Sequence, residues 1–283
     1  MTRADPVAAI TEAEATGETA ALYAQIRGVL GVPVVNLIWR HLATIPNGLP
    51  WAWESLRPLY ADGTIEDEAS ALRSQLTLPS GENFASPMTQ RTLSANERMR
   101  IDTILASYER SNAMNLIALA ALKAKLAGTV LAQPHTVSAT GKPATPIDAQ
   151  MPEALSVNEM DPATATLVEN LNRLGARGAI VPTMYRHLAH WPSFLEHLLG
   201  LLEPLDATGF IESAILDVVE QSTQRGQAIA TRLAVPHTSL DDAAQVTVRA
   251  AVETFRLGPL PKMTAIVAII TSAMPNRTSD RTL

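Results

Sequence analysis

The sequence predicts an all-α protein made of two homologous helical repeats of about 130 residues each, packed as a pseudo-twofold unit. Hydrophobic residues make up 47% of the 283 residues but aromatic residues only 4%, so the core consists mainly of Leu, Ala, Ile and Val. Such a core favours packed helices over sheets. No stretch alternates apolar and polar residues between hairpin turns, as a half-buried strand would. In addition, one part of the chain repeats another.

The internal repeat is clearest between residues 38–66 and 184–212, which align without a gap at an offset of 146 residues. Of the 29 aligned pairs, 13 are identical, where chance gives about two. The segments 107–122 and 254–269 align at an offset of 147 residues. The chain therefore carries two copies of one helical unit.

The boundaries between the copies follow from composition. Residues 133–150 are rich in Pro, Thr and Ala and lack apolar periodicity, which is typical of a linker. We therefore assign residues 1–132 to repeat 1 and residues 151–283 to repeat 2, with a Pro/Thr-rich linker between them.

Helix signals recur along repeat 1. Residues 16–19 precede LYAQIRGVLG, where Leu22 and Ile26 fall on one helical face. Asn47 follows a proline at the expected start of a later helix, and Gly63 lies in a turn before another. These signals predict successive short helices.

Similar signals recur in repeat 2. Asp161 can cap a helix that Pro162 begins, and Gly175 suits the end of that helix. Ser193 and Glu196 have the spacing of a capping box at the start of a later helix.

Composition also narrows the classes of function. The net charge is −6 with no run of Lys or Arg, so we expect no nucleic-acid partner and no anionic membrane surface. The absence of cysteine excludes disulfides, thiol chemistry and thiolate metal sites. The first residues lack a signal-peptide core, and no apolar run reaches the roughly 18–20 residues that span a bilayer. We expect a soluble, cytoplasmic protein.

Positions that differ between the copies mark the expected site. A cleft between two copies is lined by matched positions, so it becomes chemically asymmetric where they differ. Among the pairs that differ, Trp39/Tyr185, Asn47/Ser193 and Asn115/Lys262 are the first candidates for this cleft, and Gly48/Phe194 differs beside them.

Two asparagines are candidates for binding a ligand or water, and three histidines are candidates for binding a metal. Asn112 and Asn115 lie in an apolar helical segment, where a buried amide must bond to backbone, water or a ligand. His187 lies near two other histidines, but it is matched by His41 in a copy that lacks them. A zinc site needs three or four ligands, so we predict no metal.

Several of these segments carry a resemblance to a known family. VPVVNLIWRHLATIP, the repeated P-x-x-L frame, SNAMNLIALAAL and the duplicated all-α layout resemble the group I 2-haloacid dehalogenases. The resemblance implies a helical, often dimeric enzyme with its active site between the repeats. It also implies hydrolysis of 2-haloalkanoic acids of both hands to 2-hydroxy acids. An aspartate activates the water that displaces halide directly, and neither cofactor nor metal is required.

The resemblance also implies roles for individual residues. The water-orienting asparagine corresponds to Asn112 or Asn115, and the pocket serine to Ser193. The catalytic aspartate is expected directly after that serine, where this chain has Phe194; Glu196 is a nearby acid. The residues expected to bind substrate are Trp39, Leu42, Tyr108, Tyr185 and Ser193.

Phe194 leaves the predicted reaction open, because phenylalanine cannot accept a proton from water. The alignment could be one residue out, another acid such as Glu196 or Asp206 could act as the base, or the hydrolytic chemistry could be lost. The leading hypothesis is a hydrolase acting on the carbon–halide bond of a 2-haloacid. The alternative is a non-hydrolytic homodimer that binds a small carboxylate or is structural.

Overall fold

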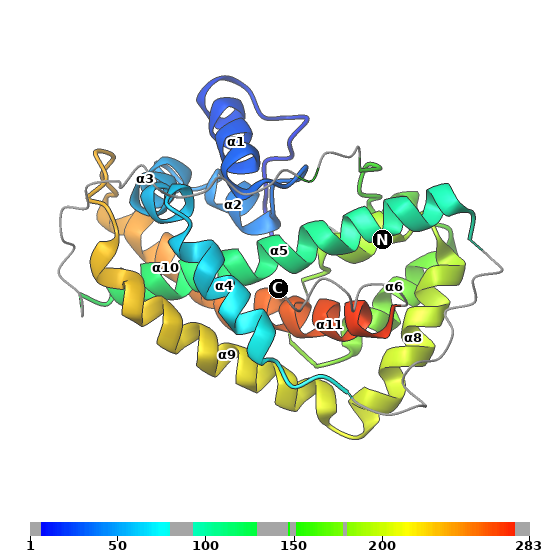
Figure 1. Ribbon diagram of the computed structural model, residues 1–283. Coiled ribbons are helices and arrows are strands. Elements are labelled where there is room, and N and C mark those ends of the chain that lie inside the picture. The colour runs from blue at the N-terminus through cyan, green and yellow to red at the C-terminus, as the bar shows by residue number, and fades with distance from the viewer. Residues whose placement is uncertain (1–6, 80–92, 129–146, 148–150, 178–179, 275–283) are drawn as a thin grey trace.

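The computed structural model describes residues 7–79, 93–128, 147, 151–177 and 180–274. All regular elements in these ranges are helices, and no strand occurs among them (Figure 1). The all-α prediction is confirmed. Of the predicted linker, only residue 147 belongs to the described part of the chain.

The helices fall into two series along the chain. In the first copy they are α1 (Gly17–Leu30), α2 (Leu37–Leu42), α3 (Gly48–Ala61), α4 (Thr64–Gln75) and α5 (Ala95–Leu126). In the second copy they are α6 (Pro162–Arg173), α7 (Thr183–Leu188), α8 (Pro192–Ala207), α9 (Phe210–Ile229), α10 (Asp242–Leu257) and α11 (Pro259–Ala273), with short 3-10 turns at Val157–Glu159 and Ala230–Arg232.

The helix bounds follow the offset of the sequence repeat. The starts of α2 and α7, and those of α4 and α9, differ by 146 residues. The start of α5 and that of α10, and the end of α5 and that of α11, differ by 147 residues. One long helix in the first copy thus corresponds to two helices in the second. The pseudo-twofold packing of the copies stays a prediction.

Local sequence explains the helix boundaries. Pro259 and Pro261 cannot sit in a helix interior without losing backbone hydrogen bonds, so the helix that would match α5 breaks at Gly258. Gly63 and Gly209 precede α4 and α9 with φ of 82° and 77°, a left-handed conformation that suits glycine.

The caps predicted in the second copy differ in outcome. Asp161 accepts hydrogen bonds from the backbone of Ala163 and Thr164 at the start of α6, as predicted. The predicted capping box at Ser193 is wrong. Helix α8 begins one residue earlier, at Pro192, and its N-cap residue Trp191 makes no side-chain cap bond.

Helix α5 is the central element. It packs against α4, α9, α10 and α11, and Figure 1 shows it running above α9 and α11. Close approach to α9 depends on Gly226, because a Cβ added there would lie 2.4 Å from the Ala120 Cβ. Contacts also run between α5 and α7 and between α2 and α10, so each copy's long helix segment touches the other's short helix.

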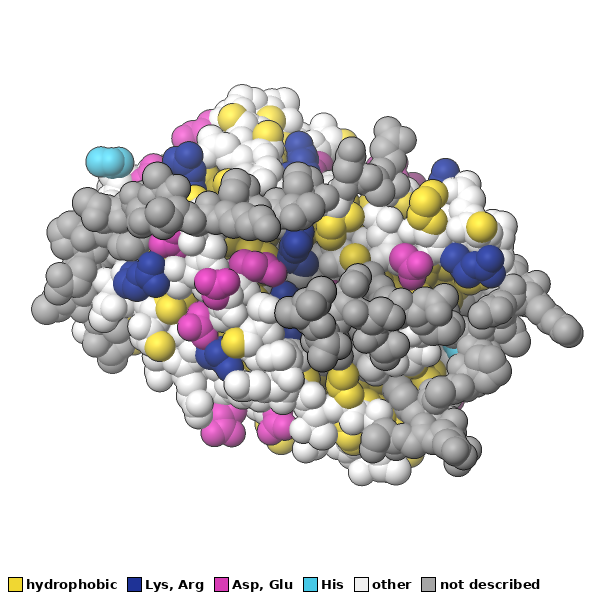
Figure 2. All heavy atoms as spheres, viewed as in Figure 1, with side chains coloured by type: hydrophobic (Ala, Val, Ile, Leu, Met, Phe, Trp, Pro, Cys, Tyr) yellow, Lys and Arg dark blue, Asp and Glu magenta, His cyan; other side chains and the backbone are white. Residues whose placement is uncertain are grey.

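The surface carries mixed charge. On the face in Figure 2, Lys and Arg side chains are interspersed with Asp and Glu side chains among the described residues. No helix in the described ranges combines the length and apolar character needed to cross a membrane.

Candidate functional site

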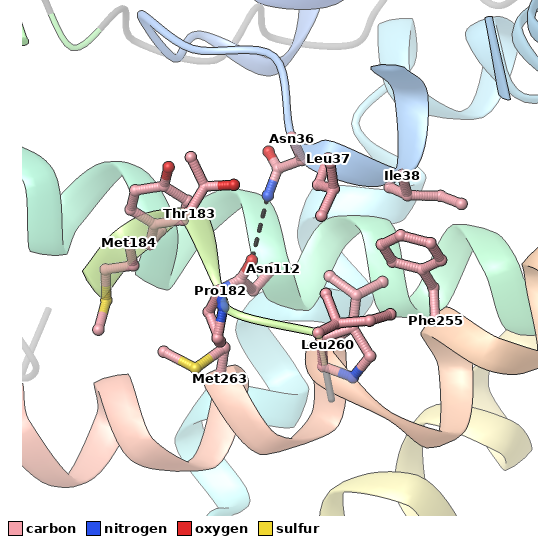
Figure 3. A pocket seen from close by; sticks show the side chains of 13 residues that line it. Asn36, Leu37, Ile38, Asn112, Pro182, Thr183, Met184, Phe255, Leu260 and Met263 are labelled. Carbon is pink, nitrogen blue, oxygen red and sulfur yellow. Dashed lines mark hydrogen bonds between the residues drawn. The ribbon is translucent and has the colours of Figure 1, made fainter. Parts of the chain in front are cut away.

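A pocket lies where helices of the two copies meet. It holds about 380 Å³ of empty space including its open mouth, between the start of α2, the middle of α5, the start of α7 and the α10–α11 junction (Figure 3). The residues that line it from the first copy are Asn36, Leu37, Ile38, Tyr108 and Asn112. Those from the second copy are Ile180, Pro182, Thr183, Met184, Phe255, Pro259, Leu260 and Met263.

Matched positions form the two walls of this pocket. At the offsets of the sequence repeat, the matched lining pairs are Asn36/Pro182, Leu37/Thr183, Ile38/Met184, Tyr108/Phe255 and Asn112/Pro259. Three of the five pairs place a polar residue in the first copy opposite an apolar one in the second. The pocket therefore has a polar wall and a largely apolar wall, with Thr183 as the polar exception.

Asn36 and Asn112 form the centre of the polar wall. Asn36 Nδ2 donates to Asn112 Oδ1 over 3.1 Å, the dashed bond in Figure 3. Both residues are buried, with 5% and 3% of their surface exposed. Asn36 Oδ1 and Asn112 Nδ2 have no hydrogen-bond partner among the described residues. Both residues line the pocket, and the pair leaves one acceptor and one donor unused.

Arg40 supplies positive charge beside the pocket. Its Nη2 donates to the Thr183 hydroxyl over 3.0 Å, and its buried Nε has no partner within the described ranges. Because Thr183 accepts this bond, its own hydroxyl proton can point to a ligand. The charges of Arg40 and Arg186 act to lower the pKa of Tyr108, while Glu12 opposes them. Arg40 and Arg186 thus bring positive charge, and Glu12 negative charge, close to the pocket residue Tyr108.

Tyr108 and His187 are coupled across the copies. The Tyr108 hydroxyl lies 3.0 Å from His187 Nδ1, and the rings are 5.8 Å apart. Burial raises the pKa of Tyr108, so its hydroxyl is protonated. Burial lowers the pKa of His187 to about 3, with Arg40 and Arg186 acting in the same direction. His187 is therefore neutral and a weak base near pH 7.

The structure separates the two candidate asparagines. Asn112 lines the pocket, whereas Asn115 lies one turn further along α5, outside the lining. Asn115 Oδ1 accepts from Trp39 Nε1 over 3.0 Å and from the Tyr60 hydroxyl over 2.8 Å. Trp39 and Leu42 are buried in the core and do not line the pocket. Asn115 thus ties together helices behind the pocket.

The residues expected around Ser193 lie elsewhere. Ser193 and Glu196 are exposed on α8, and Phe194 is a core residue with 2% of its surface exposed. Tyr185 is fully buried. None of these four residues lines the pocket. The candidate base Asp206 instead accepts a hydrogen bond from the Gly175 amide over 2.9 Å.

Sequence reasoning missed Asn36, Thr183 and Met184. Asn36 and Thr183 lie one or two residues before the aligned segments 38–66 and 184–212, and Met184 is the first residue of the second segment. If the alignment is continued by two residues towards the N-terminus at the same offset, it gives the pairs Asn36/Pro182 and Leu37/Thr183. These pairs are the sequence signal that could have identified Asn36 and Thr183.

Among the described residues, the pocket lining contains no Asp, Glu or His side chain. In the described part of the chain, no group of three or more His, Cys, Asp or Glu residues could hold a metal ion. The chemistry of the pocket is that of amides, hydroxyls and a nearby guanidinium.

Comparison with known proteins places the fold. No family model matches the chain, and a search of curated proteins finds no match. Among solved structures, the chain is similar to a D-2-haloacid dehalogenase mutant at 18% identity and a TM-score of 0.73. It is also similar to a D-2-haloacid dehalogenase mutant in complex with D-2-CPA, at 16% identity and a TM-score of 0.72. A third similar structure is a D-2-haloacid dehalogenase with L-LA, at 18% identity and a TM-score of 0.71.

Each of these similarities covers 96% of this chain and 97% of the other. The chain therefore has the all-helical fold of the D-2-haloacid dehalogenases over nearly its whole length. This agrees with the fold expected from the resemblance to the group I 2-haloacid dehalogenases.

Proposed function

We propose that the pocket binds a small 2-substituted carboxylic acid and does not hydrolyse a carbon–halogen bond. The observation that carries the proposal is a buried polar wall with an unused amide donor, in a pocket that no carboxylate of the described residues lines.

Several groups support binding of an acid. Asn112 Nδ2 is a buried donor without a partner among the described residues, and such a donor gains most from a charged acceptor. The Thr183 hydroxyl and the field of Arg40 add to this preference. The apolar wall suits a short alkyl chain.

The absence of a base argues against hydrolysis. Attack by water on the carbon that bears a halogen requires a group that accepts the proton of that water. The residue that follows the pocket hydroxyl of Thr183 is Met184, whose thioether cannot fill this role. His187 has a pKa of about 3 and is already bonded to Tyr108.

Hydrolytic 2-haloacid dehalogenation is the second candidate. Its support is the fold that the chain shares with D-2-haloacid dehalogenases, one of them in complex with D-2-CPA. It would require a base from outside the lining residues. For either function, a homodimer stays a prediction.

The test combines ligand titration with a chloride assay. We expect 2-chloropropionate to bind saturably in calorimetry while chloride stays at the background level. Chloride release by the unaltered protein would contradict the proposal and favour the second candidate. Absence of binding would contradict both.

A pair of variants tests where a carboxylate base must stand for hydrolysis to occur. Met184→Asp places a carboxylate on the pocket wall, so we expect it to raise chloride release above background. Phe194→Asp places the same group in the core outside the lining, so we expect no release. Release by Phe194→Asp alone would show that the site lies near α8 rather than in this pocket.

A further inference from the structure

We infer that the pocket selects 2-hydroxy acids over 2-halo acids, and that Asn36 is the residue that makes this selection. The inference rests on the proposed binding of a small acid and adds the class of substituent on its second carbon.

The observation is the unused hydrogen-bonding capacity of the Asn36–Asn112 pair. One side chain donates to the other over 3.1 Å, which leaves Asn36 Oδ1 and Asn112 Nδ2 without partners among the described residues. If both amides were rotated by half a turn, the free acceptor and donor would exchange places. In either orientation, one acceptor and one donor of the pair stay unpaired, and both residues line the pocket.

A 2-hydroxy acid can satisfy both groups. Its carboxylate accepts from the free amide N–H, and its hydroxyl donates to the free amide oxygen. A chlorine or bromine atom cannot donate, so a 2-halo acid leaves the free amide oxygen unpaired, which is that of Asn36 in the orientation described. An ammonium group could also donate, but the guanidinium of Arg40, which donates to the pocket hydroxyl of Thr183 over 3.0 Å, would repel it, so we expect a 2-amino acid to bind more weakly.

The apolar wall alone predicts the opposite order of affinities, with the 2-halo acid bound more tightly than the 2-hydroxy acid. Phe255, Leu260 and Met263 line the side away from the amide pair. A halogen is less strongly hydrated than a hydroxyl, so a purely apolar site would bind the 2-halo acid more tightly. The two orders of affinity therefore distinguish selection by Asn36 from simple apolar burial.

The experiment compares lactate, 2-chloropropionate, propionate and alanine in calorimetry at pH 7, where all four carboxyl groups are ionised. We expect lactate to bind about tenfold or more tightly than 2-chloropropionate, because a buried acceptor left unpaired weakens binding by that order. We expect alanine to bind more weakly than lactate.

Two outcomes would overturn the inference in different ways. Tighter or equal binding of 2-chloropropionate would overturn it and leave the proposed acid binding intact. Absence of binding by any of the acids would remove the proposed function and this inference together. Titrations of the unaltered protein are sufficient to distinguish these two outcomes.

A matched pair of variants tests the role of Asn36. Asn36→Leu removes the amide from the polar wall, and Asn36 makes no side-chain cap bond to α2 that would be lost. We expect it to weaken lactate binding about tenfold and to bring the lactate-to-chloropropionate affinity ratio close to one. Phe255→Leu on the other wall should change both affinities by similar factors. An unchanged ratio in folded Asn36→Leu would overturn the assignment to Asn36.

Discussion

The two copies use the same frame but treat one matched buried position differently. In the first copy that position is Asn115, whose side-chain oxygen accepts from Trp39 and Tyr60. In the second copy it is Lys262, a cation with 1% of its surface exposed. A neutral amide therefore joins two aromatic side chains in one copy, and a buried charge stands in its place in the other.

The partners in the second copy differ accordingly. Lys262 Nζ donates to the backbone oxygen of Asn172 over 2.5 Å, in the last turn of α6. The position that matches Trp39 is Tyr185, whose buried hydroxyl has no partner in the described part of the chain. The position that matches Tyr60 is Asp206, which accepts from the Gly175 amide. Lys262 thus bonds to the end of a helix, where a cation is favourable.

The comparison shows how a duplicated helical unit becomes asymmetric. Apolar packing and turn glycines are kept in both copies, because both must bury a similar helical core. Buried polar residues differ between the copies, and their hydrogen-bond partners differ with them. In this chain the first copy supplies most of the polar wall of the pocket, and the second copy supplies most of the apolar wall.

The largest expected effect comes from removing the amide of the first copy. Asn115→Leu keeps the approximate shape but leaves Trp39 Nε1 and the Tyr60 hydroxyl buried without an acceptor. At about 1–3 kcal/mol for each unpaired group, we expect the free energy of unfolding to fall by about 3–5 kcal/mol. Urea denaturation followed by circular dichroism measures this change.

The matched control is Lys262→Met in the second copy. Methionine keeps much of the shape, and loss of the bond to Asn172 is offset by removal of a buried charge. We expect a change below about 1.5 kcal/mol at pH 7. Equal effects of the two variants would show that the copies do not differ in the way described above.

A smaller effect should appear in the pH dependence of stability. Burial lowers the pKa of Lys262 to about 8, with the charge of Asp206 acting in the opposite direction. An unfolded lysine titrates near about 10.4, so between these values the unfolded state binds more protons than the folded state. The free energy of unfolding therefore rises with pH in this window.

We expect the unaltered protein to gain roughly 2–3 kcal/mol relative to Lys262→Met between pH 8 and pH 10. Urea denaturation of both proteins across this range, at constant ionic strength, isolates the contribution of Lys262. A difference that stays constant with pH would show that Lys262 is as well solvated in the folded state as in the unfolded one.

The sequence predicted the helical class well because the causes are local. Low aromatic content, Gly63 and Gly209 before matched helices, and Asp161 as a cap act within a few residues of where they stand. The helices that these features start or end can therefore be predicted without knowledge of how the helices pack. The same local reasoning overlooked the break at Pro259, although a proline after a glycine is a strong signal.

The site was harder to predict because it depends on packing between distant segments. Ser193 lies in a segment that aligns well with the first copy, but the first turn of α8 turns this residue to the surface. Asn36 lies just outside that alignment, yet its position at the N-cap of α2 brings it within hydrogen-bonding distance of Asn112 on α5. Alignment identifies equivalent positions, whereas the pocket depends on which faces of the helices meet.

The smallest expected effect comes from making one contact of the first copy resemble its counterpart. Tyr108 contacts His187 with its hydroxyl and ring, while the matched Phe255 stacks on the matched His41 with ring centroids 5.8 Å apart. Tyr108→Phe removes only the hydroxyl. We expect the free energy of unfolding at pH 7 to fall by about 1 kcal/mol, the typical value of one buried neutral hydrogen bond.

Urea denaturation of Tyr108→Phe measures this loss, and the double variant with His187→Phe shows whether it arises from the bond between them. Because Phe255 already packs on His41 without a hydroxyl, the ring contact belongs to the shared frame of the copies. A loss well above about 2 kcal/mol would mean that the hydroxyl also supports Asn112 and the rest of the polar wall. A loss of about 1 kcal/mol that disappears in the His187→Phe background would assign it to the Tyr108–His187 bond, and would leave Asn36 and Asn112 as the groups that make the pocket polar.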